Sequence, residues 1–331
     1  MNSIYYDSGT TNTRAYLFCN RKLVHQLSVE IGSKDCALSG NNSKLLHMLK
    51  KMYDELLKTS GLRNDDIQDI WMSGMISSST GILEIPHLTV PVNLHLIRKG
   101  VVKYFEPLCF QRTLCIIPGI KTSLADERLS YDTFTKINNM RGEETEIFGI
   151  LDQYPFLKKK CILILPGSHT QIAVIKNGAI EDILSTITGE LYNAIIHSTI
   201  LATSLAPSEE NIILPHMVSK GFHALQKFGF NRALYTVRTM ELFLPSSSSE
   251  RNSYFEGILN GGVITSISSL VSLNAPAQIA VYGSQNNLTV FQTLCNECFP
   301  EIPFTGIEKN DFPYSARGFL SISLKKQSEP Y

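Results

Sequence analysis

Short apolar runs separated by polar turns fill the first 30 residues of the chain. The runs at 3–6, 14–18 and 22–29 are rich in aromatic and aliphatic side chains, and the polar segments 7–12 and 19–21 separate them. Runs of this kind, joined by tight turns, predict three β-strands arranged as a meander.

A helical pattern follows the meander. Leucines and a tyrosine recur at helical spacing between 44 and 58, and Gly61 lies beyond them as a stop signal. Two further apolar runs, at 70–72 and 114–117, predict strands. Strands that alternate with a helix in this way are typical of an α/β domain.

The meander pattern returns in the second half of the chain. Three apolar runs again follow one another, at 161–165, 171–175 and 180–184. The first ends in a polar loop, as before, and the loop glycines Gly9 and Gly167 stand 158 residues apart. The pair Asn177-Gly178 is a strong hairpin signal. Two unrelated hairpins could coincide in this way, but the better interpretation is two related domains.

We therefore expect an N-terminal domain at 1–150 and a C-terminal domain at 151–331. Helical stripes predict the helices of the second half, and one more apolar run predicts a strand at 278–282. The predicted helices are 140–151, 191–201, 233–244, 254–270 and 288–298.

Composition narrows the class of protein. The 331 residues carry 30 basic and 30 acidic side chains, so nothing indicates binding to nucleic acid or to an anionic membrane. No apolar run approaches the ~20 residues of a membrane span, and the N-terminus does not resemble a signal peptide. Seven scattered cysteines favour reduced thiols. We expect a cytoplasmic globular protein; a homodimer is left open.

The first loop has a definite chemical use. Gly9 lets the backbone approach a ligand closely, and Thr10, Thr11 and Asn12 add neutral donors for phosphate oxygens. Asp7 stands at the strand end, where a carboxylate can hold a hydrated Mg²⁺ ion.

The second loop, at 167–170, repeats the glycine and the donors with Gly167, Ser168, His169 and Thr170 but has no acid. Either loop alone is most simply an ordinary turn, because turns favour these residues. The pair, facing each other, is able to hold a triphosphate from two sides.

These motifs resemble a known family. The segment 7–16 resembles the first phosphate loop of the actin/hexokinase ATPase superfamily. Together with Arg-Gly-Glu-Glu-Thr at 141–145, Pro-Gly-Ser-His-Thr at 166–170 and Thr-Gly-Glu-Leu at 188–191, it is similar to the bacterial 2-dehydro-3-deoxygalactonokinases. The resemblance implies two ribonuclease-H-like (actin-like ATPase) α/β domains with a cleft between them.

The resemblance also implies an activity. Such a carbohydrate kinase, a phosphotransferase with an alcohol group as acceptor, uses ATP and Mg²⁺. It moves the γ-phosphate to the terminal (6-) hydroxyl of 2-dehydro-3-deoxy-D-galactonate, a step of galactonate degradation. In related kinases a carboxylate at the start of a helix accepts the proton, which indicates Glu143 or Glu144, and we favour Glu143. Alternatively, both acids merely complement the helix dipole.

Other positions are candidates for ligand contacts. Arg141 could hold the substrate carboxylate through two parallel hydrogen bonds, and Glu190 and Ser77 could contact the sugar acid. The resemblance assigns Gly283, after the predicted strand 278–282, to an adenosine-contacting loop. Alternatively, Arg14 or Arg238 takes that role or binds phosphate, although each could equally be a structural or surface side chain, and Glu190 caps its helix.

The match is weakest on the sugar side. The segment 76–82 reads Ile-Ser-Ser-Ser-Thr-Gly-Ile and lacks the larger polar and aromatic residues usual in the family. Two alternatives therefore stay open: a kinase for another sugar or sugar acid, and a catalytically impaired nucleotide-binding relative.

Overall fold

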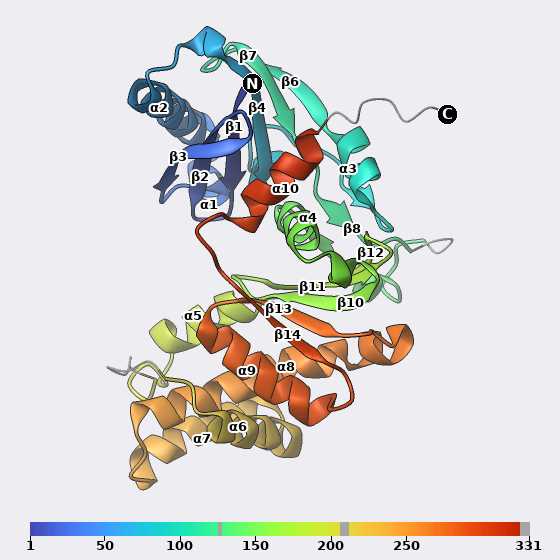
Figure 1. The fold of residues 1–331 in the computed structure, drawn as a ribbon. Coiled ribbons are helices and arrows are strands. Elements are labelled where there is room, and N and C mark those ends of the chain that lie inside the picture. The colour runs from blue at the N-terminus through green and yellow to red at the C-terminus, as the bar shows by residue number, and fades with distance from the viewer. Residues whose placement is uncertain (125–127, 206–211, 325–331) are drawn as a thin grey trace. The chain divides into compact units, whose positions relative to one another are not determined.

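The predicted N-terminal meander is present and belongs to a six-stranded sheet. The computed structural model describes residues 1–124, 128–205 and 212–324. In sheet order the strands are β3 (Lys22–Val29), β2 (Thr13–Cys19), β1 (Asn2–Ser8), β4 (Ile67–Gly74), β7 (Arg112–Ile116) and β6 (Val102–Glu106) (Figure 1). The first three strands pair antiparallel, whereas β4 and β7 continue the sheet parallel to β1.

Alternating side chains of the central strands build two cores. Ile4 and Tyr6 face α2 (Ser43–Ser60), whose leucines cover that side of the sheet. Tyr5 faces the other way and stacks on Phe319 of α10 (Tyr314–Ser323), with the ring centroids 4.8 Å apart. Because both faces are buried, β1 reads as a continuous apolar run.

Smaller elements complete the first half of the chain. They are α1 (Ser33–Ser39), β5 (Leu88–Thr89), α3 (Leu94–Gly100), β8 (Ile120–Lys121), β9 (Asn139–Met140) and α4 (Glu143–Gln153). Helix α4 packs along α10 (Figure 1).

The second half repeats the strand order. Its five-stranded sheet runs β12 (Ala179–Thr186), β11 (Thr170–Lys176), β10 (Lys160–Leu165), β13 (Ile279–Gly283) and β14 (Phe304–Glu308). Strand β10 lies in the middle of this sheet, as β1 does in the first, and it pairs antiparallel with β11 and parallel with β13. The repeat predicted from the two loops is confirmed, and so is the fold class of two ribonuclease-H-like α/β units.

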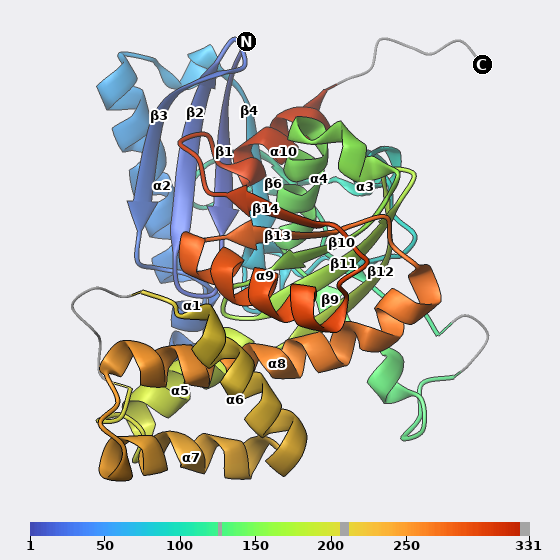
Figure 2. The same ribbon diagram turned by 60° about the horizontal axis from the view of Figure 1, so that its bottom comes forward.

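Helices cover the second sheet and form a core of their own. They are α5 (Thr188–Ser198), α6 (Pro215–Phe228), α7 (Phe230–Phe243), α8 (Ser248–Asn274) and α9 (Gln285–Cys298). Helices α6, α7 and α8 pack on one another (Figure 2). No helix in the three described stretches is long and apolar enough to cross a membrane.

The chain divides into two units that are not sequential. The first comprises Met1–Lys158, Gly178–Glu181 and the stretch beginning at Asp311, and the second comprises Lys159–Asn177 and Asp182–Asn310. The boundary expected between residues 150 and 151 differs from this division mainly at the C-terminus. There α10 returns to the first unit, because Ala316 and Phe319 cover the aromatic face of β1 and β2.

Three local features have simple causes, the first as predicted and the other two different from the prediction. Asn177 and Gly178 both have positive φ (51° and 75°), as the hairpin signal requires. Helix α4 begins at Glu143 rather than at 140, because Gly142 has φ 114° and ends the preceding extended segment. Strand β6 lies at an edge with alternating exposure, and its pattern was too weak to predict it.

Candidate active site

The loop between β1 and β2 is held by the start of the next helix. The carbonyl oxygens of Gly9 and Thr10 accept hydrogen bonds from the amides of Ser33 (3.2 Å) and Lys34 (2.9 Å) in α1. A Cβ atom at Gly32 would lie 2.5 Å from each of these oxygens. Only glycine fits at that position, so Gly32 is required for the loop conformation although no motif marks it in the sequence.

The same loop offers free backbone donors. The Gly9 amide closes the turn by donating to the Asn12 carbonyl oxygen at 2.8 Å. The amides of Thr10, Thr11 and Asn12 donate to no partner within the described stretches, and Thr11 and Asn12 are exposed. Successive unpaired N–H groups beside hydroxyl groups suit the oxygens of a phosphate.

Asp7 lies next to this loop, near the end of β1. Its carboxylate is 3.8 Å from the Arg14 guanidinium. Burial raises the pKa of Asp7, while the charge of Arg14 and a hydrogen bond from Ser315 act in the opposite direction. No group of three or more His, Cys, Asp or Glu residues in the described parts could hold a metal ion. A single carboxylate such as that of Asp7 is enough for Mg²⁺, because this ion usually keeps several waters and takes one or two carboxylates.

Two glycines bring the start of α4 to the same strand end. Gly74 (φ 85°) pairs with the last residue of β1. Gly142 (φ 114°) precedes α4, and a Cβ atom there would lie 3.2 Å from the Gly74 Cα. This approach brings Glu143 near Asp7, whose charge adds to the effect of burial in raising the pKa of Glu143.

The two acids differ in their surroundings. Glu144 is fully buried and accepts hydrogen bonds from the Gly142 amide (2.7 Å) and the Thr145 hydroxyl (3.4 Å). Burial and the charge of Glu143 raise the pKa of Glu144 to about 8. Glu143 is half-buried, and its Oε2 atom has no hydrogen-bond partner among the residues described. Burial, with a smaller contribution from Asp7, raises the pKa of Glu143 to about 7.

Arg141 and Ser77 are bonded inside the protein. The Arg141 guanidinium donates to the Ser77 carbonyl (2.6 Å) and hydroxyl (2.8 Å) oxygens, the Ile85 carbonyl oxygen (2.8 Å) and His87 Nδ1 (3.3 Å). The Ser77 side chain is buried and donates to the Gly74 carbonyl oxygen. These bonds occupy both groups predicted to contact substrate, and they fix the loop that follows β4.

His87 is a candidate that the sequence offered no signal for, because it is a single histidine outside any motif. Burial, and then the charges of Arg141 and Lys121, lower its pKa to about 4. Its Nε2 atom is buried without a hydrogen-bond partner in the described stretches. Because Nδ1 accepts from Arg141, the neutral imidazole carries its proton on Nε2, which can donate to a ligand oxygen.

The loop between β10 and β11 is built like the first. The Ser168 carbonyl oxygen accepts a hydrogen bond from the Glu190 amide in α5 at 2.9 Å. A Cβ atom at Gly189 would lie 2.2 Å from the Gly167 carbonyl oxygen. Gly167 and Ser168 are exposed, whereas Thr170 is buried. The pair Gly9 and Gly32 in the first unit therefore corresponds to Gly167 and Gly189 in the second.

The remaining predicted contacts also lie in the second unit. His169 Nε2 is 3.5 Å from Glu190 Oε1, and both side chains are more than one-third exposed, at 39% and 56%. Gly283 is buried at the end of β13, where a Cβ atom would lie 2.9 Å from Asn287 Cβ. The Ser284 hydroxyl after it caps α9 by accepting from the Asn287 amide. Gly283 thus permits the tight start of α9.

Comparison with known proteins identifies the family. The family model described as 2-keto-3-deoxy-galactonokinase matches residues 7–299. The chain belongs to this family. The match includes both loops and the two acids of α4.

Two relatives support the assignment. The chain is 23% identical over 274 residues to the 2-dehydro-3-deoxygalactonokinase of Escherichia coli (strain K12), with 81% of each chain covered. It superposes on the crystal structure of a proposed 2-dehydro-3-deoxygalactonokinase from Sinorhizobium meliloti with a TM-score of 0.74 and 18% identity, covering 97% of each chain. The chain is therefore a carbohydrate kinase of the 2-keto-3-deoxy-galactonokinase family, and the family implies ATP and a sugar acid as substrates.

Proposed function

We propose that this kinase transfers the γ-phosphate of ATP to the terminal hydroxyl of 2-dehydro-3-deoxy-D-galactonate, in galactonate degradation and in the cytoplasm. The observation that carries the proposal is Glu143. It has one unpartnered carboxylate oxygen and a pKa raised to about 7, beside a loop with free amides. A general base works best when its pKa lies near the operating pH.

In the proposed reaction each residue has a limited task. The amides of Thr10, Thr11 and Asn12 bind phosphate oxygens in the first unit, and the loop at 167–170 does the same in the second. Asp7 would hold Mg²⁺, which would supply positive charge to the phosphates. Glu143 accepts the proton of the substrate hydroxyl, whose oxygen forms the new bond to the γ-phosphorus as the bond to the β-phosphate oxygen breaks and ADP leaves.

Glu144 and Arg141 have supporting tasks in this proposal. Glu144 accepts from the Gly142 amide and fixes the start of α4, so it positions Glu143. Arg141 fixes the loop containing Ser77. Glu190, His169 and Gly283 remain candidates for ligand contacts from the second unit.

A kinase for another sugar acid is the second candidate. The specific observation in its favour is Arg141, because the residue expected to hold the substrate carboxylate already makes four bonds within the protein. A different side chain then has to recognise the carboxylate, and the preferred substrate changes with it.

A coupled assay of ADP release tests both candidates. The purified protein is given ATP, Mg²⁺ and a panel of aldonates and 2-keto-3-deoxy sugar acids. Release with 2-dehydro-3-deoxy-D-galactonate above all other compounds supports the first candidate, and release with another acid supports the second. ATP binding without release for any compound contradicts both and indicates an impaired relative.

A further inference from the structure

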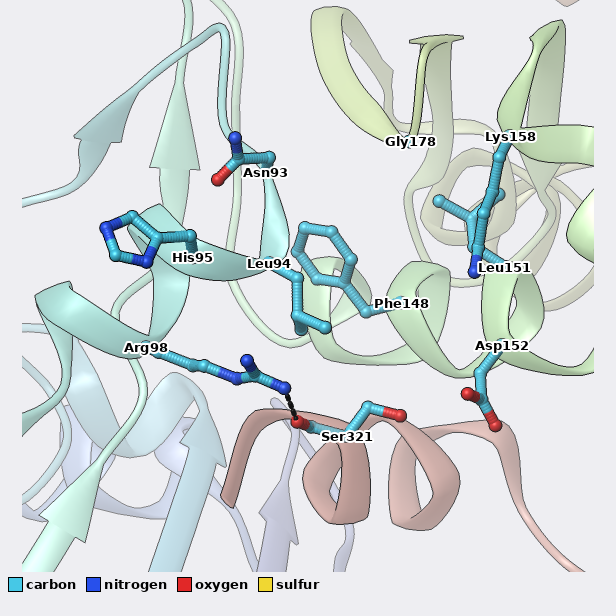
Figure 3. Close-up of a pocket in the computed structure, with 10 residues that line it drawn as sticks. All are labelled: Asn93, Leu94, His95, Arg98, Phe148, Leu151, Asp152, Lys158, Gly178 and Ser321. Atoms are coloured by element: carbon cyan, nitrogen blue, oxygen red, sulfur yellow. Dashed lines mark hydrogen bonds between the residues drawn. The ribbon is translucent and has the colours of Figure 1, made fainter. Parts of the chain in front are cut away.

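A pocket of about 400 Å³ lies in the first unit among α3, α4 and α10 (Figure 3). Leu94, Phe148 and Leu151 provide its apolar part, and Arg98 and Lys158 provide cationic groups. None of these residues belongs to the loop or the acids proposed for catalysis. The volume falls in the range of pockets that bind small molecules.

Arg98 is only partly satisfied by the protein. Its Nη2 atom donates to the Ser321 carbonyl oxygen at 2.6 Å, and Figure 3 shows the guanidinium extending from α3 toward that residue. Its Nε atom is buried and has no hydrogen-bond partner among the described residues. That atom is closed to solvent, so a ligand in the pocket would reach the guanidinium through Nη1, which donates to no partner among the described residues.

The charges around the pocket favour an anion. Lys158 is exposed and adds a second cation, and His95 at the rim adds a further donor. The opposing charge is Asp152, whose Oδ2 atom is 3.4 Å from Arg317 Nη1. Because Arg317 offsets Asp152, the positive charges of Arg98 and Lys158 remain uncompensated within the pocket.

We propose that this pocket binds a small organic anion, with its carboxylate or phosphate monoester group on Arg98 and its carbon skeleton against Phe148 and Leu151. Guanidinium groups bind both kinds of oxyanion strongly. The proposal does not depend on the reaction of the first unit, because the ligand shares no residue with the proposed catalytic groups.

Isothermal titration of the full chain with three probes tests the proposal. Phenyl phosphate and benzoate carry the two candidate anionic groups on an apolar ring, and benzamide is the neutral control. We expect at least one anion to bind and benzamide to bind at least about tenfold more weakly. Binding of phenyl phosphate alone assigns a phosphate, and binding of benzoate alone assigns a carboxylate.

Matched variants locate the binding. We expect Arg98→Gln to weaken anion binding about tenfold and Lys158→Gln about threefold, whereas Lys99→Gln, an exposed neighbour on α3, leaves it unchanged. Lys158 is exposed, so its variant decides the matter if Arg98→Gln does not fold. The Glu143→Gln variant should bind as the unmodified chain does, whatever its turnover.

Three results would overturn the proposal. These are no binding of either anion, equal binding of benzamide, and anion binding that persists unchanged in both Arg98→Gln and Lys158→Gln. The last result would place the anion at the phosphate loops instead.

Discussion

The two hairpin loops of this kinase share one construction and differ in their chemistry. In each unit a glycine at the start of the next helix, Gly32 or Gly189, packs against a loop carbonyl oxygen, and a helix amide binds a carbonyl oxygen of the same loop. Only the first unit carries an acid at the strand end. At the 158-residue offset that relates the loops, the position equivalent to Asp7 is the buried Leu165.

This difference predicts which unit carries out the reaction and which one only binds phosphate. Backbone geometry, which both units retain, is sufficient to hold phosphate oxygens. Carboxylates with altered pKa values occur in the first unit beside its loop. Burial raises the pKa values of Asp7, Glu143 and Glu144, and the charge of Asp7 adds to the shift of Glu143 as that of Glu143 adds to the shift of Glu144. We therefore expect the first unit to carry the proton transfer and the second to contribute binding alone.

Removing the acid of each unit tests the comparison most strongly. We expect Glu143→Gln to lower kcat at least about 100-fold, because it removes the proton acceptor, with the dissociation constant of ATP unchanged. The matched variant Glu190→Gln in the second unit should keep kcat within about threefold, since a binding contact acts mainly on KM. Steady-state assays and ATP titration measure both, and normal turnover by Glu143→Gln would exclude it as the base.

The pH dependence should follow the same acid. A base must be unprotonated, and the pKa of Glu143 is raised to about 7. With saturating substrates, kcat should therefore fall about tenfold for each pH unit below that value, or about 100-fold at pH 5. A kcat that stays level between pH 5 and pH 8 would contradict a role for a group with this pKa.

Adding a methyl group at the equivalent glycines should affect both units alike. Gly32→Ala and Gly189→Ala each place a Cβ atom within 2.5 Å of loop carbonyl oxygens, so we expect each loop to shift and the KM for ATP to rise about tenfold. Gly262→Ala on α8 meets nothing within 4 Å and is the control. An effect in only one unit would mean that only one loop binds ATP.

The smallest effect is on stability. Glu144 binds its proton more tightly in the folded state, since its pKa is raised to about 8. Its contribution to the free energy of unfolding is therefore greatest at low pH and falls as pH rises from its unfolded pKa of about 4.3 to about 8. The free energy of unfolding of Glu144→Gln should therefore fall less between pH 5 and pH 8 than that of the unmodified chain. Urea unfolding at pH 5 and pH 8 measures the free energy of unfolding of both proteins. An equal change between the two pH values in the unmodified chain and in Glu144→Gln would contradict the prediction.

Much of the local structure was predictable from short-range patterns. The meanders at both sites, the Asn177-Gly178 turn and the helix after residue 43 follow from residue spacing and turn chemistry. Helix α10 was not predicted. Its packing against Tyr5 and Phe18 joins residues some 300 positions apart, and no local pattern reports such a contact.

The sequence identified which residues belong to the site, but it did not distinguish their individual roles. Motif spacing identified Glu143 and Glu144 together, yet their sequence positions are equivalent as helix-starting acids. Burial and hydrogen bonding distinguish them in the structure, because Glu144 accepts from Gly142 and Thr145 while one Glu143 oxygen stays unpartnered. Arg141 was assigned to a ligand because a guanidinium can hold a carboxylate through two hydrogen bonds. Its bonds to Ser77 and Ile85 cross more than 50 residues of sequence, so no local pattern reveals them.

The sequence by itself determined the family, the repeated meander and the residues available for chemistry, since these depend on residue identity and on spacing within a few turns of chain. Tertiary structure alone decided which side chains are already bonded, which atoms lack partners and which carboxyl groups have raised pKa values. Those properties depend on burial and on charges brought together from distant segments, so no local rule could supply them.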